Sequence, residues 1–189
     1  MRIRPIRFLL GLFLASLALG AACFAAATPG PETTPIPVPP KPDWSSMKFL
    51  VGTWECSTQS SRRPGPYTAT VVTTLDATGY WMDSKTVTAK VSWALGATSV
   101  DQVTYDSDQH RWVDVYTDTQ GNYDVTFSPG WSGNTMVWKD ALFAPGPDVV
   151  ATSPLTVTKV NDTKQTSHSS FTEKSGRKNT VDQVCTKKS

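Results

Sequence analysis

From Asp43 onward, apolar and polar residues alternate in short runs rich in Thr, Val, Tyr and Trp, with Gly, Asn and Asp between the runs. Alternation with a period of two is typical of β-strands that bury one face. No window predicts a helix longer than two turns, although Asp43 is a suitable N-cap for one short helical turn over 44–49. The predicted strands span 50–59, 67–76, 80–89, 97–105, 111–118, 122–128, 134–141, 153–160, 164–173 and 178–187.

About ten short strands joined by tight turns predict an all-β fold, either an antiparallel meander closed into an up-and-down barrel or a sandwich. Closure removes the exposed edge strands, so we expect the barrel, preceded by the short helical turn. The chain has 189 residues, of which 39% are hydrophobic, and this is enough material for one such domain.

The strands predicted at 111–118 and 122–128 flank a three-residue loop that ends in Gly121. Pairing Asp118 with Asn122 matches the apolar faces of the two strands, with Val115 opposite Val125. We expect this apolar face to point into the barrel, because a slip of one residue would mix the two faces. The residues predicted to point inward are Val113, Val115, Tyr123, Val125 and Phe127.

The two ends of the domain can be placed by a similar argument. In an up-and-down barrel with an even number of strands, the first and last strands meet antiparallel. If Cys56 lies opposite Cys185, the same register places Trp54 opposite Lys187. We therefore expect a Cys56–Cys185 disulfide and a cation over the Trp54 indole, and two reduced, buried cysteines are the alternative. The wide spacing of these cysteines argues against a Cys-x-x-Cys redox pair.

Residues 1–27 differ from the rest of the chain. They carry three arginines and no acid at the start, then an uncharged apolar run, and they end in three alanines at 25–27. This order is typical of a secretory signal peptide, so we expect cleavage after Ala27 and a secreted or periplasmic protein without a membrane span in the mature chain. A retained anchor is the alternative, because the uncharged run approaches the roughly 20 residues that a membrane-spanning helix needs.

Cys23 is a candidate lipid anchor that would tether the protein to the cell envelope. It follows Leu19 by four positions, where the usual bacterial lipoprotein signal has a spacing of three. Residues 28–42 hold seven of the fourteen prolines and predict an extended linker of about 45 Å. Removing the three arginines of the leader from 18 basic residues leaves 15 against 16 acidic ones. This balance argues against a nucleic-acid partner, which would require a clustered positive surface.

The segment Phe49-Leu50-Val51-Gly52-Thr53-Trp54 places a Gly-x-Trp motif at the start of the first predicted strand. After a short helical turn, this motif resembles the calycin group: lipocalins, fatty-acid-binding proteins and nitrobindin-like proteins. The strand count, Val103-Thr104-Tyr105-Asp106 and the later Arg111-Trp112-Val113 look most like nitrobindin-related bacterial lipocalin-like families of unknown function.

This resemblance covers about residues 44–188 and implies a lipocalin-like β-barrel domain at 43–189. It also implies that Trp54 closes the barrel floor and that Lys187, a basic residue of the last strand, covers it. Nitrobindin-like haem binders have a histidine near the chain end, but the strand predicted at 178–187 has none. We therefore expect no haem and no other cofactor. Two histidines and three cysteines also leave little material for a metal site.

A polar group is predicted near one rim of the barrel. If Tyr105 pairs with Arg111, Asp101 also faces the interior. A carboxylate, a phenol and a guanidinium in an apolar cavity can orient the polar end of a ligand, with Tyr123 and Phe127 among the walls. The alternative is a structural ion pair that satisfies polar groups inside a small barrel.

These observations predict an exported protein that binds a small apolar or amphipathic molecule in the barrel. The sequence contains no Gly-x-Ser-x-Gly, His-Glu-x-x-His or phosphate-binding glycine loop. A cofactor-free isomerase or lyase that uses Asp101 with Tyr105 stays open, as does a structural module with a filled interior. Trp131, in a Pro-Gly-Trp-Ser-Gly turn, is a packing residue or a contact for a partner.

Overall fold

A computed structural model describes residues 37–92, 96–144 and 148–188. The predicted signal peptide, Cys23 and most of the predicted linker lie outside these ranges. The chain divides into two units, Met1–Pro37 and Val38–Ser189, and the second contains every strand named below. Within the described ranges, no helix is both long enough and apolar enough to cross a membrane.

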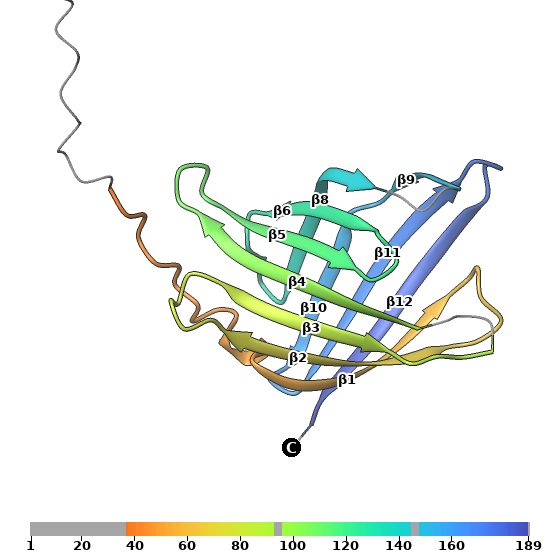
Figure 1. Cartoon of the computed structure of the whole chain (residues 1–189), viewed down its shortest axis with the longest axis horizontal. Coiled ribbons are helices and arrows are strands. Elements are labelled where there is room, and N and C mark those ends of the chain that lie inside the picture. Colours follow the sequence, from red (N-terminus) through yellow and green to blue (C-terminus); the bar gives the residue numbers. More distant parts are fainter. Residues whose placement is uncertain (1–36, 93–95, 145–147, 189) are drawn as a thin grey trace, which may run out of the picture. The chain divides into compact units, whose positions relative to one another are not determined.

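Ten antiparallel strands form one closed barrel, so the predicted all-β, up-and-down fold is confirmed (Figure 1). Each strand pairs with the next one in the following order, and the last pairs with the first. The strands are β1 (Gly52–Ser60), β2 (Tyr67–Leu75), β3 (Met82–Thr88), β4 (Ala97–Asp106), β5 (Arg111–Asp118), β6 (Tyr123–Ser128), β8 (Thr135–Ala144), β10 (Leu155–Asn161), β11 (Lys164–Glu173) and β12 (Lys178–Lys187).

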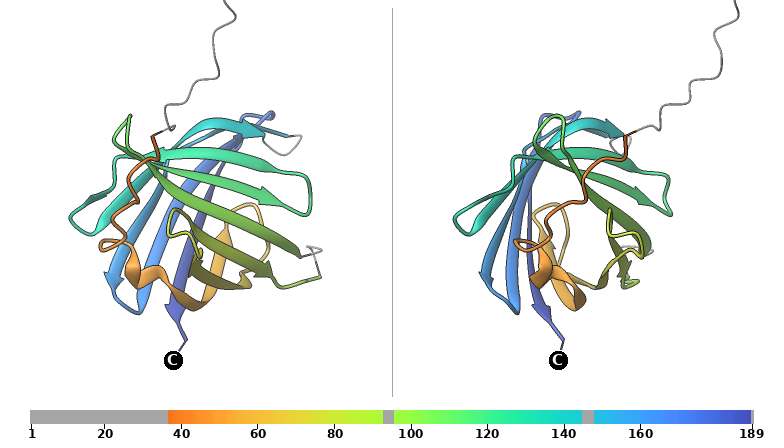
Figure 2. Two further views of the ribbon diagram at one scale, coloured as in Figure 1. Left: turned by 60° about the vertical axis from the view of Figure 1, so that its left-hand side comes forward. Right: turned by 90° about the vertical axis from the view of Figure 1, so that its left-hand side faces the viewer.

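Three short elements complete the domain. Strand β7 (Trp131–Ser132) pairs with β8, and β9 (Val149–Thr152) pairs with β11. The predicted helical turn is present as a 3-10 turn, η1 (Lys48–Leu50), immediately before β1. Asp43 supports the chain just before this turn, because its Oδ1 accepts a hydrogen bond of 2.9 Å from the Ser45 backbone N–H. In Figure 2, the barrel strands wrap around a common axis.

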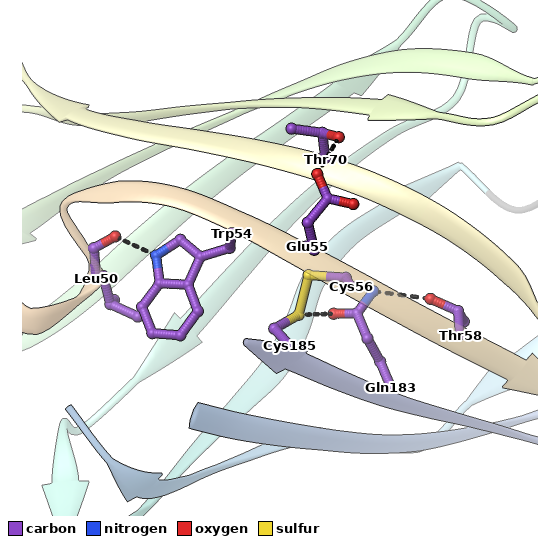
Figure 3. Close-up of a disulfide and its surroundings, with 8 residues drawn as sticks. All are labelled: Leu50, Trp54, Glu55, Cys56, Thr58, Thr70, Gln183 and Cys185. Carbon is purple, nitrogen blue, oxygen red and sulfur yellow. Dashed lines mark hydrogen bonds between the residues drawn. A yellow bond between two sulfur atoms is a disulfide. The ribbon is translucent and has the colours of Figure 1, made fainter. Parts of the chain in front are cut away.

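The predicted register of the two ends is confirmed. Strand β1 pairs with β12 so that Trp54 lies opposite Lys187 and Cys56 opposite Cys185. The two cysteines form a disulfide between residues 129 positions apart (Figure 3). The barrel is thus closed by a covalent bond as well as by the backbone hydrogen bonds between its first and last strands.

The register predicted between β4 and β5 is wrong by one residue. Tyr105 pairs with Trp112, and Asp106 pairs with Arg111. The cause is the turn after β4, where Oδ1 of Asp106 accepts hydrogen bonds from the backbone N–H groups of the second and third residues that follow. The turn is therefore one residue shorter than expected, and this reverses the face that β5 presents to the interior.

The inward face predicted for the β5–β6 hairpin is wrong as well, although its strand pairing is confirmed. Trp112 on β5 and Thr126 and Ser128 on β6 are buried, whereas Tyr123 is 44% exposed. Because strand residues alternate between faces, the more apolar set lies on the outside of the barrel. That set is Val113, Val115, Tyr123, Val125 and Phe127.

One end of the barrel is closed by the segment that precedes β1. The Met47 side chain is only 1% exposed and belongs to the main apolar cluster of the barrel. The Trp44 indole N–H donates a hydrogen bond of 3.0 Å to the Gly79 carbonyl, which attaches the segment to the β2–β3 connection. The buried members of the cluster are Trp44, Met47, Met82, Trp112, Met136 and Trp138.

Candidate functional site

The barrel contains a cavity of about 220 Å³ that is lined by two chemically different sets of residues. We call the apolar set the floor; its main residues are Met47, Trp54, Met82, Trp131, Met136 and Trp138. We call the polar set the polar wall; it comes from β3, β4 and β5 and from β11 and β12, and its main residues are Ser84, Thr86, Asp101, Asp114, Gln165 and Gln183. Apolar burial beside a few convergent polar groups is the usual composition of a small-molecule site.

The polar groups around Trp54 are satisfied within the protein. The Trp54 indole N–H donates a hydrogen bond of 2.7 Å to the Leu50 carbonyl, which Figure 3 shows beside the disulfide. Lys187 Nζ lies 5.5 Å from the centroid of the Trp54 ring and donates a hydrogen bond of 2.8 Å to the Phe49 carbonyl. These contacts hold the Lys187 ammonium beside the Trp54 ring, at the two residues to which the resemblance assigns the barrel floor.

Gly52 makes room for this lysine. Its φ of +130° favours glycine, and a Cβ at this position would lie 2.8 Å from Lys187 Cε. The glycine of the Gly-x-Trp motif therefore serves both the backbone turn into β1 and the close approach of the last strand. This gives the motif a physical reason in the present chain.

Two carboxyl groups dominate the polar wall. Asp101 on β4 and Asp114 on β5 lie on the inner faces of neighbouring strands, because Asp101 pairs with Tyr116 and Asp114 with Val103. They are diagonal neighbours on one face, a spacing at which side chains interact. Removal from bulk water raises the pKa of Asp101 to about 7.

The pKa of Asp114 is raised well above its ordinary value, first by removal from water and then by the negative charges of Asp101 and Asp124. Asp124, on β6, has a pKa raised to about 6 by removal from water and by the charge of Asp140. Tyr116, between these carboxyls, has a raised pKa mainly because it is withdrawn from water. The wall is thus an unusually acidic surface for a barrel interior.

Three residues that line the cavity each carry a buried polar atom without a hydrogen-bond partner among the described residues. The atoms are Oδ1 of Asp114, Oε1 of Gln165 and Nε1 of Trp131. Leaving such an atom unsatisfied costs about 1–3 kcal/mol. The polar groups around the cavity are therefore not all satisfied by the described part of the protein.

The structure does not bring the five predicted ligand-binding residues together. Asp101 lines the cavity, but Tyr105 packs in the core with its ring centroid 5.1 Å from that of Trp112. Arg111 lies on the outer face, 3.4 Å from the centroid of the Phe127 ring and 3.8 Å from the Asp106 carboxylate. Tyr123 and Phe127 belong to the same outer face.

Sequence reasoning missed Asp114, Gln165 and the inward role of Trp131. A signal for Asp114 was present, because it alternates with Trp112 and Tyr116 on one face of its strand. Trp131 packs edge-on against Phe49 with centroids 5.6 Å apart, so its packing role is observed at the border of the cavity.

The comparisons with known proteins support the fold. No protein-family model matches the sequence, and no curated protein matches it. The crystal structure of Rv2717c from M. tuberculosis is similar, with a TM-score of 0.56 and 11% identity over 77% of this chain and 97% of that chain. A de novo designed fluorescence-activating β-barrel aligns with a TM-score of 0.38 and 14% identity over 75% of this chain and 95% of that one. At this identity, the similarity to Rv2717c shows a shared barrel architecture and nothing further. The TM-score of the designed barrel is too low to support a conclusion.

Proposed function

We propose that the protein binds a small amphipathic molecule inside the barrel. The observation that carries this proposal is the 220 Å³ cavity, which is lined by the apolar residues of the floor and by the carboxyl, amide and hydroxyl groups of the polar wall. A barrel that served only as a structural module would fill this space with side chains, since protein interiors are close-packed. At about 30 Å³ per liquid water molecule, the cavity has room for about seven waters or for one small organic molecule.

The occupant would lie with its apolar part on the floor and its polar end at the polar wall. Trp54, Trp131 and Trp138 contribute aromatic side chains to the cavity lining, and Asp101 and Asp114 contribute carboxyl groups. Of the predicted ligand-binding residues, only Asp101 keeps this role in the proposal.

The test is a titration of the purified protein with two probes of suitable size, the neutral 2-phenylethanol and the positively charged 2-phenylethylamine. Binding is followed by calorimetry and by the fluorescence of the indoles that line the cavity. Val157 lines the cavity, so Val157→Phe should fill it and weaken binding at least tenfold. Val160→Phe is the matched control, because Val160 lies on the same strand and is 50% exposed. Absence of binding by both probes, or equal binding by Val157→Phe and the wild type, contradicts the proposal.

A cofactor-free enzyme is a second candidate, favoured by one observation. The pKa of Asp101, about 7, suits a general base at neutral pH. Tyr105, the partner expected from the sequence, does not line the cavity. If the wild type converts a natural occupant chemically and Asp101→Asn does not, the enzyme is favoured. If neither protein changes the occupant, the binding protein is favoured.

We also propose that the chain is exported, with residues 1–27 removed and residues 28–42 serving as a linker. The Cys56–Cys185 disulfide supports this proposal, since disulfides persist mainly in oxidising compartments. The mass of the protein isolated from cell fractions tests it. A chain that begins after Ala27 supports cleavage there, whereas a lipid-modified chain that begins at Cys23 shows anchoring. A full-length chain in the cytoplasm contradicts export.

A further inference from the structure

The cavity is lined by carboxyl groups and, among the described residues, by no basic side chain. Asp101 and Asp114 both line it, and Asp124 on β6 adds a third carboxyl close enough to affect Asp114. None of the described residues that line the cavity is Lys, Arg or His. Carboxyl groups on the outer surface differ in this respect: Glu55 lies 2.8 Å from Lys188, and Asp162 lies 2.7 Å from Lys159.

The unsatisfied atoms of the polar wall are acceptors. Oδ1 of Asp114 is a carboxylate oxygen and Oε1 of Gln165 is an amide oxygen, and both are buried without a partner in the described part of the chain. The two residues lie on different strands, β5 and β11, and both line the cavity. Carboxylate and amide oxygens accept hydrogen bonds from N–H donors, and hydrogen bonds to a charged group are the stronger ones.

The floor suits the rest of such an occupant. Indole faces attract cations as well as apolar groups, and Trp54, Trp131 and Trp138 all line the cavity. The protein uses this attraction once already, where Lys187 lies over Trp54. A cavity that combines buried carboxyl groups with indole faces discriminates in favour of a positive charge attached to an apolar group.

We propose that the occupant is a small organic cation, a primary or secondary ammonium whose charge meets Asp101 and Asp114 and whose apolar part packs on the floor. This inference rests on the proposed function, because it names the chemical class of the molecule that the cavity binds. The cation supplies the counter-charge that the cavity lacks and donates hydrogen bonds to the acceptors of the polar wall.

The experiment compares 2-phenylethylamine, which is an ammonium ion at pH 8, with 2-phenylethanol, its neutral counterpart of nearly equal size. Calorimetry at pH 8 measures both affinities, above the Asp101 pKa of about 7. We expect the ammonium to bind at least tenfold more tightly than the alcohol. Because a cation favours ionised carboxyls, its binding should also release protons and weaken toward pH 5, where Asp101 and Asp124 become neutral.

Asp101→Asn and Asp114→Asn should each reduce the preference for the ammonium while binding of the alcohol persists. Asp182→Asn is the matched control, because this carboxyl is 60% exposed beside His168 on the outer surface. Equal binding of the alcohol and the ammonium by the wild type overturns the cation but keeps the proposed function. Binding of neither overturns both. The wild-type comparison decides the matter even if a variant does not fold.

Discussion

The floor and the polar wall of the cavity are built on opposite principles. In the floor, large apolar side chains pack closely, and the Trp54 indole N–H finds a protein partner in the Leu50 carbonyl. In the polar wall, Asp101 and Asp114 are withdrawn from water beside each other, and Oδ1 of Asp114 has no partner among the described residues. The floor therefore contributes stability, whereas the wall costs stability and offers recognition instead. Residues that oppose stability in this way are concentrated at functional sites.

Loss of the disulfide beside the floor should have the largest effect on the free energy of unfolding. Cys56→Ala combined with Cys185→Ala opens a link between residues 129 positions apart, worth about 4–5 kcal/mol on the chain-entropy model. Urea unfolding of the wild type with and without a reductant measures the loss, and the double variant should not respond to the reductant. Equal stability of the oxidised and reduced wild type would contradict the structural role of the bond.

The contribution of the floor to stability can be tested by replacing Met47. Met47→Ala removes a side chain that is 1% exposed from the main apolar cluster, so we expect a loss of about 3 kcal/mol in the free energy of unfolding. Lys48→Ala, at the exposed neighbouring position, should change it by less than about 0.5 kcal/mol. If the two variants lose the same stability, the segment before β1 does not close the barrel as described.

The polar wall should make stability depend on pH. A carboxyl whose folded pKa is raised contributes stability that is present below its ordinary pKa, near 4, and lost as the pH rises through its folded value. For Asp101, with a pKa of about 7, we expect a loss of about 4 kcal/mol between pH 4 and pH 8. Asp101→Asn should reduce this dependence and be more stable than the wild type at pH 8.

Urea unfolding at both pH values measures this effect, with Asp182→Asn as the control for losing an exposed carboxyl. If Asp101→Asn parallels the wild type over this range, the carboxyl is not withdrawn from water. In that case the floor and the polar wall would differ less than the structure indicates.

Replacing Lys187 should have the smallest effect on the free energy of unfolding. Lys187→Met removes the cation over Trp54 and the hydrogen bond to the Phe49 carbonyl, for a loss of about 1 kcal/mol. Lys188→Met removes an exposed lysine next in sequence, whose ion pair with Glu55 is worth little at the surface. Thermal unfolding should separate the two variants, and an equal response would show that the contact with Trp54 adds nothing.

Sequence reasoning was accurate where backbone geometry decides the answer. Strand alternation predicted the ten barrel strands, and the antiparallel meeting of first and last strands predicted the register of Cys56 with Cys185. It was wrong at the turn after Asp106, where a local side-chain hydrogen bond shortens the loop by one residue. The preference for the more apolar face then misled the prediction, because the interior beside Asp114 is polar. A partly polar interior breaks the rule that the apolar face points inward, so hydrophobic patterning alone could not locate the cavity residues.

The central claim is that the barrel holds a small molecule, and native mass spectrometry tests it most directly. The protein is purified without denaturation and measured before and after incubation with 2-phenylethylamine. The account predicts one additional small mass per barrel in at least one of the two samples, and its loss in Val157→Phe but not in Val160→Phe. The bare protein mass in both wild-type samples would contradict the claim.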